Sequence, residues 1–145
     1  MNADAHHRAL ERMYLAAPFN SIFQPRIRIA NEFAEVEMDL REQFHHAAGA
    51  VHGAVYFKML DDAAFFAANS VETEYFVLTT AFTTYLTRPM SSGRMVACGR
   101  VVNRNKSQII AEAVVRNADG IELGRGSGMF VRSKTPLADV ASYQR

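Results

Sequence analysis

The sequence predicts an α+β fold in which an antiparallel sheet wraps around one long central helix, preceded by a short N-terminal helix. Residues 53–69 form a nearly all-apolar run without proline, which is typical of a helix that is buried on most sides. Four strand-like segments follow with short turns between them, and consecutive strands of this kind pair in antiparallel fashion. Together these observations predict a helix enclosed by its own sheet.

The boundaries of the other elements follow from changes in the hydrophobic period. Residues 6–16 place apolar side chains three and four positions apart, which predicts an amphipathic helix that ends before Pro18. Residues 26–40 alternate apolar and polar side chains, which predicts two half-buried strands. Residues 41–52 are expected to be a loop. The four later strands are expected at residues 76–89, 94–102, 108–116 and 121–132.

A sheet curled around one helix is the hotdog fold, and residues 1–145 suit a single domain of this kind. We expect the core within residues 26–132. The tail, residues 134–145, has little periodicity and is expected to be partly loose. One helix cannot cover both faces and every edge of such a sheet, so we expect the chain to form a homodimer.

The composition excludes several classes of function. The formal net charge of +1 gives no reason to expect nucleic acid or an anionic membrane as a partner. Cys98 is the only cysteine, which fits a reducing compartment. We see neither a secretory signal nor a run of about 20 apolar residues that could span a membrane. The sequence therefore predicts a cytoplasmic protein.

Two adjacent aspartates interrupt the apolar helix, and helical geometry gives them different neighbours. Asp62 follows Lys58 by four residues, which is the spacing of an ion pair within a helix. Asp61 lies four residues from both Phe57 and Phe65, on an apolar side. Burial there would raise the pKa of Asp61 and make its carboxylate a better proton acceptor. A structural carboxylate, bonded to backbone or to a partner's lysine, fits the same pattern about equally well.

The segment before the helix has the features of an anion site. Gly49 and Gly53 permit tight backbone near a ligand. The helix is expected to begin near Gly53, where free N–H groups and the positive end of the helix dipole can hold an oxyanion. Asp61 follows His52 by nine residues, or about two and a half turns. The N–H groups at the start of the helix and the carboxylate of Asp61 are therefore too far apart to meet at one substrate atom within a single chain. We expect Asp61 to act across a dimer interface.

The segment HHAAGAVHGAVYFKMLDDAAFFAA, residues 45–68, resembles the signature of PaaI-type hotdog thioesterases, the phenylacetic-acid-degradation group of acyl-CoA hydrolases. The family pattern is Asn or Asp, a glycine, His-Gly-Gly, an aromatic residue and Leu-Ala-Asp. Residues 52–54 match His-Gly-Gly at two of three positions, and Phe57 and Asp61 have the family spacing. The resemblance covers roughly residues 26–132. It implies an acyl-CoA thioesterase without a cofactor, CoA being part of the substrate.

The resemblance also implies roles for individual residues. Asp61 would orient or activate water, or attack directly, and the N–H of Gly53 would bind the thioester oxygen. His52 would shape the loop. His46 stands where the family has Asn or Asp, and an imidazole can likewise donate a hydrogen bond to a carbonyl. Ala54 replaces the second glycine and would narrow the pocket.

Further contacts are expected around these groups. The family's polar helper on the following strand could be Thr79 or Thr80, because the length of the intervening loop is uncertain; Thr79 is the candidate that we carry forward. Groups expected against the acyl chain, besides Ala54, are Phe57, Met59, Phe65 and Tyr85. Groups expected against the CoA phosphates are Arg88, Arg104 and Lys106. Family members form dimers that commonly pair into tetramers, so a dimer of dimers is expected.

Other readings of the sequence remain open. His46 and Asp61 are placed somewhat like the histidine and carboxylate of hotdog dehydratases, which would make the protein a hydratase or dehydratase. The departures at His46 and Ala54 also fit an acyl-CoA-binding protein without catalysis. His6 and His7 are expected to be solvated. His45 and His46 are adjacent and should diverge, so no metal site is expected.

Overall fold

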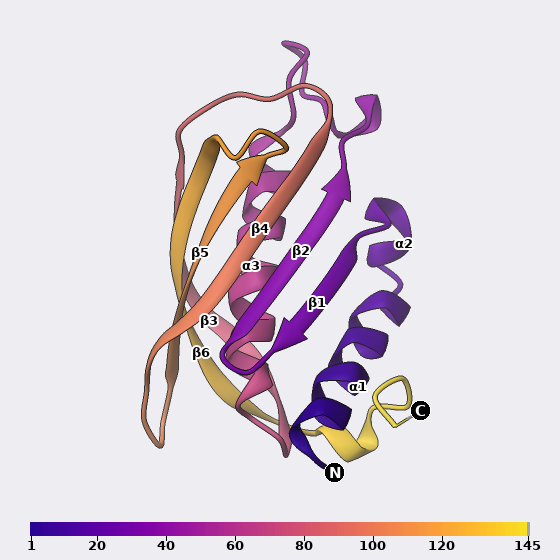
Figure 1. Ribbon diagram of the computed structural model, residues 1–145, viewed down its shortest axis with the longest axis vertical. Helices are drawn as coiled ribbons and strands as arrows, with labels where there is room; N and C mark the ends of the chain where they lie inside the picture. The colour runs from indigo at the N-terminus through magenta and orange to yellow at the C-terminus, as the bar shows by residue number, and fades with distance from the viewer. Residues whose placement is uncertain (145) are drawn as a thin grey trace.

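The computed structural model describes residues 1–144 and confirms the hotdog architecture, with one six-stranded antiparallel sheet wrapped around a long helix (Figure 1). The helices are α1 (Ala3–Ala16), α2 (Asn20–Phe23) and α3 (Gly53–Ser70), with 3-10 turns at Glu42–Phe44 and Leu137–Asp139. The strands are β1 (Arg26–Ala30), β2 (Phe33–Asp39), β3 (Tyr75–Leu86), β4 (Arg94–Arg104), β5 (Ile109–Asn117) and β6 (Glu122–Pro136). Helix α2 and the two 3-10 turns were not anticipated from the sequence.

The strands lie in the order β1-β2-β4-β5-β6-β3, so β1 and β3 form the two edges of the sheet. The core forms where the inner faces of the strands meet α3. Strand β2 shows the expected alternation, since Ala34, Val36 and Met38 are fully buried between more exposed neighbours. Gly99 of β4 lets this strand approach the helix closely, because a Cβ there would lie 2.2 Å from the carbonyl oxygen of Ala63.

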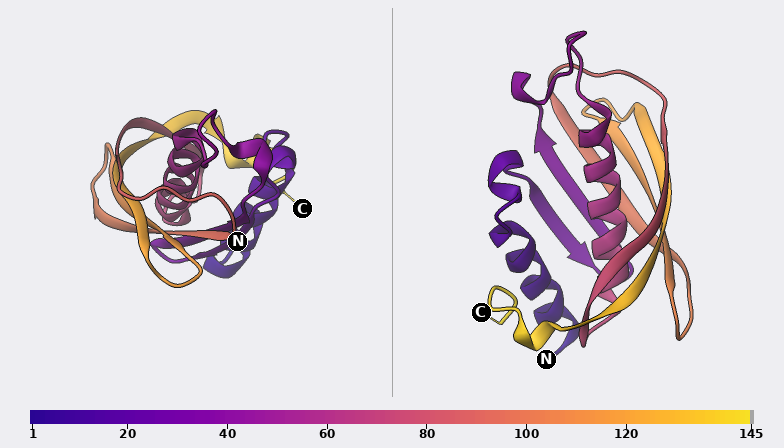
Figure 2. Two further views of the ribbon diagram at one scale, coloured as in Figure 1. Left: turned by 90° about the horizontal axis from the view of Figure 1, so that it is seen from above. Right: turned by 180° about the vertical axis from the view of Figure 1, so that it is seen from behind.

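Helix α1 lies along β1 at one edge of the sheet (Figure 2), and this position buries the two histidines that we expected to be solvated. His6 is 1% exposed; its Nε2 donates to the carbonyl oxygen of Asn69 (2.9 Å) and its Nδ1 contacts the hydroxyl of Tyr143 (2.7 Å). The expectation was wrong because His6 lies four residues before Leu10 on the buried face of α1.

The C-terminal tail is ordered over its described part, which corrects the expectation of a loose segment. Strand β6 continues to Pro136, and the side chains of Leu137 and Tyr143 are almost fully buried. Tyr143 packs edge-on against His6, so the two ends of the chain stabilise each other. Of the residues expected to be loose, 145 lies outside the described part of the chain.

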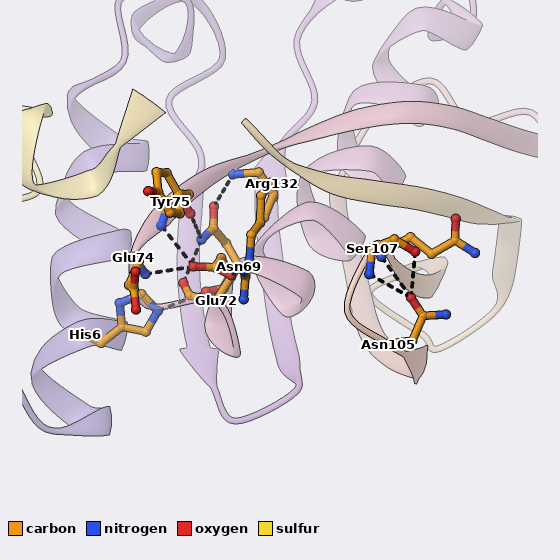
Figure 3. Close-up of polar contacts among 10 residues, drawn as sticks. His6, Asn69, Glu72, Glu74, Tyr75, Asn105, Ser107 and Arg132 are labelled. Carbon is orange, nitrogen blue, oxygen red and sulfur yellow. Dashed lines mark hydrogen bonds and ion pairs between the residues drawn. The ribbon is translucent and has the colours of Figure 1, made fainter. Parts of the chain in front are cut away.

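A polar network fixes the turn between α3 and β3 (Figure 3). The side chain of Asn69 donates to the carbonyl oxygens of Glu72 and Tyr75 (3.0 and 3.1 Å). The buried carboxylate of Glu72 accepts from the backbone N–H groups of Glu74 and Tyr75 (2.8 and 3.0 Å) and pairs with Arg132. These bonds set the start of β3 relative to the end of α3, and hence which β3 side chains face the helix.

Among residues 1–144, none of the helices combines the length and the apolar character that a membrane crossing requires.

Candidate active site

Asp61 lies near the middle of α3, on the side that faces β3. The hydroxyl of Thr79 donates a hydrogen bond of 2.8 Å to one oxygen of the Asp61 carboxylate. Partial burial raises the pKa of Asp61 to about 6. The neighbouring charge of Asp62 raises this pKa further, whereas the bond from Thr79 and the charge of Lys58 lower it. The carboxylate is therefore poised to accept a proton near neutral pH.

The structure distinguishes the two threonines that the sequence left open. Thr79 faces the helix, as its bond to Asp61 shows. Thr80 is exposed where the register between β3 and β6 shifts between Thr79 and Ala81, and its hydroxyl donates to the carbonyl oxygen of Met129 (3.2 Å). The α3–β3 turn sets which β3 residue faces Asp61, and this irregularity leaves Thr80 unpaired in the ladder.

Asp62 has the Lys58 partner that its spacing predicted, and a second partner from α1. The ammonium group of Lys58 donates to its carboxylate at 2.7 Å, and the hydroxyl of Tyr14 donates to the same oxygen at 2.6 Å. Burial raises the pKa of Asp62, and the two donors lower it. Asp62 thus has strong donors from its own helix and from α1, whereas Asp61 has a single neutral donor.

A hollow of about 360 Å³ lies beside Asp61, between the α1–α2 segment and β3; we call it the Asp61 hollow. Aromatic and aliphatic side chains form most of its wall, and the polar groups gather where α3 faces it. Its lining consists of Met13, Tyr14, Ala17, Phe19, Asn20, Lys58, Asp61, Asp62, Phe65, Phe66, Phe76, Leu78 and Thr79. An apolar hollow with a few convergent polar groups is the usual form of a small-molecule site.

The N-terminus of α3 presents one free donor. His52 is the N-cap residue, and its Nδ1 accepts from the backbone N–H of Ala54 (2.9 Å). The N–H of Val55 donates to the carbonyl oxygen of His52 (2.9 Å), whereas the N–H of Gly53 has no partner within residues 1–144. His52 therefore orders this end of the helix and leaves the Gly53 N–H available to an anion.

A second hollow, of about 290 Å³, lies at this end of α3; we call it the Gly53 hollow. It is lined by His46, Ala50, Val51, Gly53, Tyr56, Leu86, Thr87, Arg88 and Pro89. The Nδ1 of His46 accepts from the backbone N–H of Ala48 (3.0 Å). In the neutral imidazole the proton is then on Nε2, which can donate to a ligand as the family's amide would.

The two hollows are separate within one chain. Gly53 and Asp61 are eight residues apart, which corresponds to about 12 Å along the helix axis. The Gly53 hollow brings together Gly53, His46 and Arg88, and the Asp61 hollow brings together Asp61, Thr79 and Phe65. One chain therefore supplies two half-sites at different heights on α3.

The remaining predicted residues occupy varied positions. Ala54 and Phe57 are exposed on the first turns of α3, where Phe57 packs edge-on against Phe82, and Tyr85 is 60% exposed on β3. Met59, which we expected against the acyl chain, is instead 1% exposed within the core, because it lies on the opposite side of α3 from Asp61.

Arg104 and Lys106 are far from the Gly53 hollow within one chain. They lie at the β4–β5 turn, beside Val71 and Glu72 at the C-terminal end of α3, where they line a hollow of about 310 Å³. Asn105 and Ser107 close this turn by a side-chain hydrogen bond of 2.9 Å (Figure 3). Only Arg88 of the three predicted basic residues is near Gly53.

Sequence reasoning missed the contribution of the α1–α2 segment to the Asp61 hollow. Tyr14, Phe19 and Asn20 all line it. The apolar spacing of α1 indicated a packed helix, but no pattern indicated that the residues after Pro18 fold back towards α3. Within residues 1–144 we find no group of three or more His, Cys, Asp or Glu side chains that could hold a metal ion.

Comparison with known proteins identifies the family of the chain. The family model of the thioesterase superfamily matches residues 48–123, which is 76 of the 145 residues. The chain belongs to the thioesterase superfamily. The matched region includes α3 with Gly53 and Asp61, together with β3, β4 and β5.

Individual proteins are similar to the chain in sequence or in fold. A Saccharolobus solfataricus protein described as a candidate esterase is 26% identical over 132 residues, covering 88% of this chain and 94% of its own. The structure of the E. coli PaaI protein from the phenylacetic acid degradation operon matches with a TM-score of 0.84 at 20% identity, over 92% of this chain and 97% of that one. A Pseudomonas aeruginosa thioesterase matches with a TM-score of 0.76 at 15% identity, over 88% and 94%.

Proposed function

We propose that the protein is an acyl-CoA thioesterase that hydrolyses a thioester to the free acid and CoA. The observation that supports this most strongly is Asp61, a carboxylate with a raised pKa and a single neutral donor beside an apolar hollow. A carboxylate that titrates near 6 is largely ionised at neutral pH and basic enough to take a proton from water. Membership of the thioesterase superfamily supports the same chemistry.

The proposal includes a homodimer, because one chain separates the two half-sites. Strand β3 is an edge strand, and Leu78, Tyr85 and Leu86 on it are 47%, 60% and 50% exposed. Phe57 of α3, close to β3, is 42% exposed. A second copy that covers this face would hide an apolar patch and an open edge. An antiparallel copy would place its Asp61 near the Gly53 hollow of the first chain.

In the proposed reaction the carbonyl oxygen of the thioester accepts a hydrogen bond from the N–H of Gly53, assisted by Nε2–H of His46. Asp61 of the other subunit takes a proton from a water molecule as the water oxygen attacks the carbonyl carbon. The negative charge that develops on the carbonyl oxygen is stabilised by the same donors. Collapse of the tetrahedral intermediate breaks the carbon–sulfur bond, and the proton held by Asp61 passes to the CoA thiolate.

The residues that line the hollows also indicate where the CoA phosphates and the acyl group of the substrate would bind. Arg88 adjoins the Gly53 hollow and would meet a CoA phosphate there, whereas Arg104 and Lys106 could do so only from another subunit. The rings of Phe65 and Phe76 line the Asp61 hollow. Such a lining suits an aromatic acyl group, and the structural match to PaaI of the phenylacetic acid degradation operon favours the same class. A dimer of dimers would be consistent with this arrangement.

The test is a panel of acetyl-, hexanoyl-, benzoyl- and phenylacetyl-CoA, with release of free thiol as the readout. Wild-type protein should hydrolyse at least one member, and Asp61→Asn should lower kcat by at least about 100-fold on that member, the usual contribution of a general base. A matched control is Asp39→Asn, since Asp39 is an exposed aspartate at the C-terminal end of β2 and lines neither hollow. Tight acyl-CoA binding without turnover by wild-type protein would instead indicate a binding protein without catalysis.

A further inference from the structure

Lys58 lies in a box of aromatic rings that belongs to the N-terminal segment. Its ammonium nitrogen is 5.5 Å from the ring centre of Tyr14, 5.0 Å from that of Phe19 and 5.1 Å from that of Phe23. The Lys58 side chain is only 11% exposed. A largely desolvated ammonium group over aromatic faces is a favourable contact that fixes the rings as well as the charge. The α1–α2 segment is therefore held against α3 one turn before Asp61.

Asn20 connects the same segment to α3. Its side-chain oxygen accepts from the ammonium group of Lys58 (2.7 Å), and its side-chain nitrogen donates to the carbonyl oxygen of Tyr14 (2.7 Å). This orientation of the amide is dictated by its partners, since lysine only donates and a carbonyl only accepts. Tyr14 in turn donates to Asp62 (2.6 Å). Asn20 is buried, so the corner between α1 and α2 has a defined position on α3.

This fixed corner forms one side of the Asp61 hollow. Ala17 and Phe19 line the hollow together with Phe65 of α3 and Thr79 of β3. The superfamily match begins at residue 48, so the corner lies outside the matched region. Two independent parts of the chain thus enclose the space next to the reactive carboxylate, one within the matched region and the other before it.

We infer that Ala17 and Phe19, held in place by the contacts of Lys58 with Tyr14 and Asn20, form a wall that determines which acyl groups reach Asp61. This inference rests on the proposed function, since it concerns the acyl end of the same site. The wall limits the size of the acyl group, because Ala17 and Phe19 line the same hollow as Asp61. A larger side chain at position 17 fills this space, and a smaller one at position 19 extends it.

The experiment compares kcat/KM for decanoyl-CoA and for butyryl-CoA, expressed as a ratio, in wild-type protein and three variants. Phe19→Ala should raise the ratio about tenfold and Ala17→Phe should lower it about tenfold, which is the usual effect of one or two methylene groups in an apolar pocket. Ile22→Ala is the matched control, because Ile22 lies on α2, three residues after Phe19, is 54% exposed and does not line the hollow. Its ratio should stay within about twofold of wild type.

The opposite signs separate a wall from a general defect in folding, which would lower both rates together. Ratios within about twofold of wild type in both Phe19→Ala and Ala17→Phe would overturn the inference, even if wild-type protein is an active thioesterase. If wild-type protein hydrolyses no thioester, the proposed function fails. The wall is then tested by the ratio of Kd values for the same two acyl-CoAs, with the same expected signs and the same result to overturn it.

Discussion

Asp61 and Asp62 are adjacent on α3, yet they belong to two different regions of the molecule. Asp62 lies among donors, with Lys58 from its own helix and Tyr14 from α1 at 2.7 and 2.6 Å. Asp61 faces the apolar hollow with only the neutral hydroxyl of Thr79 as donor. A carboxylate that is fully paired serves the structure, and one left under-paired at a hollow is available for chemistry. Partners, rather than residue type, thus distinguish the structural carboxylate of Asp62 from the carboxylate of Asp61, which we propose to be catalytic.

The largest effect is expected when Asp62 loses its cationic partner, the ammonium group of Lys58. Lys58→Met leaves the Asp62 carboxylate buried without its charged partner, and the cost in free energy of unfolding should be about 3–5 kcal/mol. Urea denaturation followed by circular dichroism measures this. The double variant Lys58→Met with Asp62→Leu should regain a large part of the loss, because no unpaired charge then remains. Equal stability of wild type and the single variant would show that Asp62 is not a structural carboxylate.

The second prediction concerns the stability that the folded protein loses when Asp61 ionises. The pKa of Asp61 is raised in the folded protein to about 6, so its ionisation disfavours the folded state. The free energy of unfolding of wild-type protein should therefore fall as pH rises from about 4 to about 6, by at most about 3 kcal/mol. Asp61→Asn should therefore be more stable than wild type at pH 8, and the difference should disappear at pH 4. Thermal unfolding at several pH values measures it, and a variant less stable than wild type at pH 8 would contradict the prediction.

The smallest effect is expected from the single donor to Asp61. Thr79→Val removes one hydrogen bond, because valine has nearly the same side-chain volume as threonine but no hydroxyl. The loss should lower the free energy of unfolding by about 1 kcal/mol. The Thr79 bond lowers the pKa of Asp61, so its loss should raise this pKa and move the acidic limb of the pH–rate profile to higher pH. Thr80→Val is the matched control, because the exposed hydroxyl of Thr80 bonds to Met129 and not to Asp61, so its loss should leave the limb in place.

The fold was largely predictable from the sequence because its signals are local. The change from a two-residue to a helical period marks β2 and α3, and the short turns mark the later strands. The exceptions depend on distant contacts. His6 is buried by Tyr143, which lies at the other end of the chain, and no local pattern could indicate that pairing. The order of the C-terminal tail likewise depends on the contact between Tyr143 and His6 at the other end of the chain.

The neighbours that Asp61 and Asp62 have on their own helix were predictable from the sequence, whereas the surroundings contributed by other elements were not. Helical spacing alone separated Asp61 from Asp62 and paired the latter with Lys58. The choice of Thr79 needed the phase of β3, which the side chain of Asn69 and the carboxylate of Glu72 set at the end of α3. The Asp61 hollow could not be foreseen, because its second side comes from a corner after Pro18 whose position depends on tertiary contacts.

The pH dependence of kcat/KM for the best acyl-CoA substrate tests most directly whether the Asp61 carboxylate performs the chemistry. Activity should require the ionised form, so it should rise with pH through a midpoint near 6 and level off above it. The residual activity of Asp61→Asn should lack this limb. A wild-type profile that is flat between pH 4.5 and 8, or the same limb in Asp61→Asn, would contradict the account.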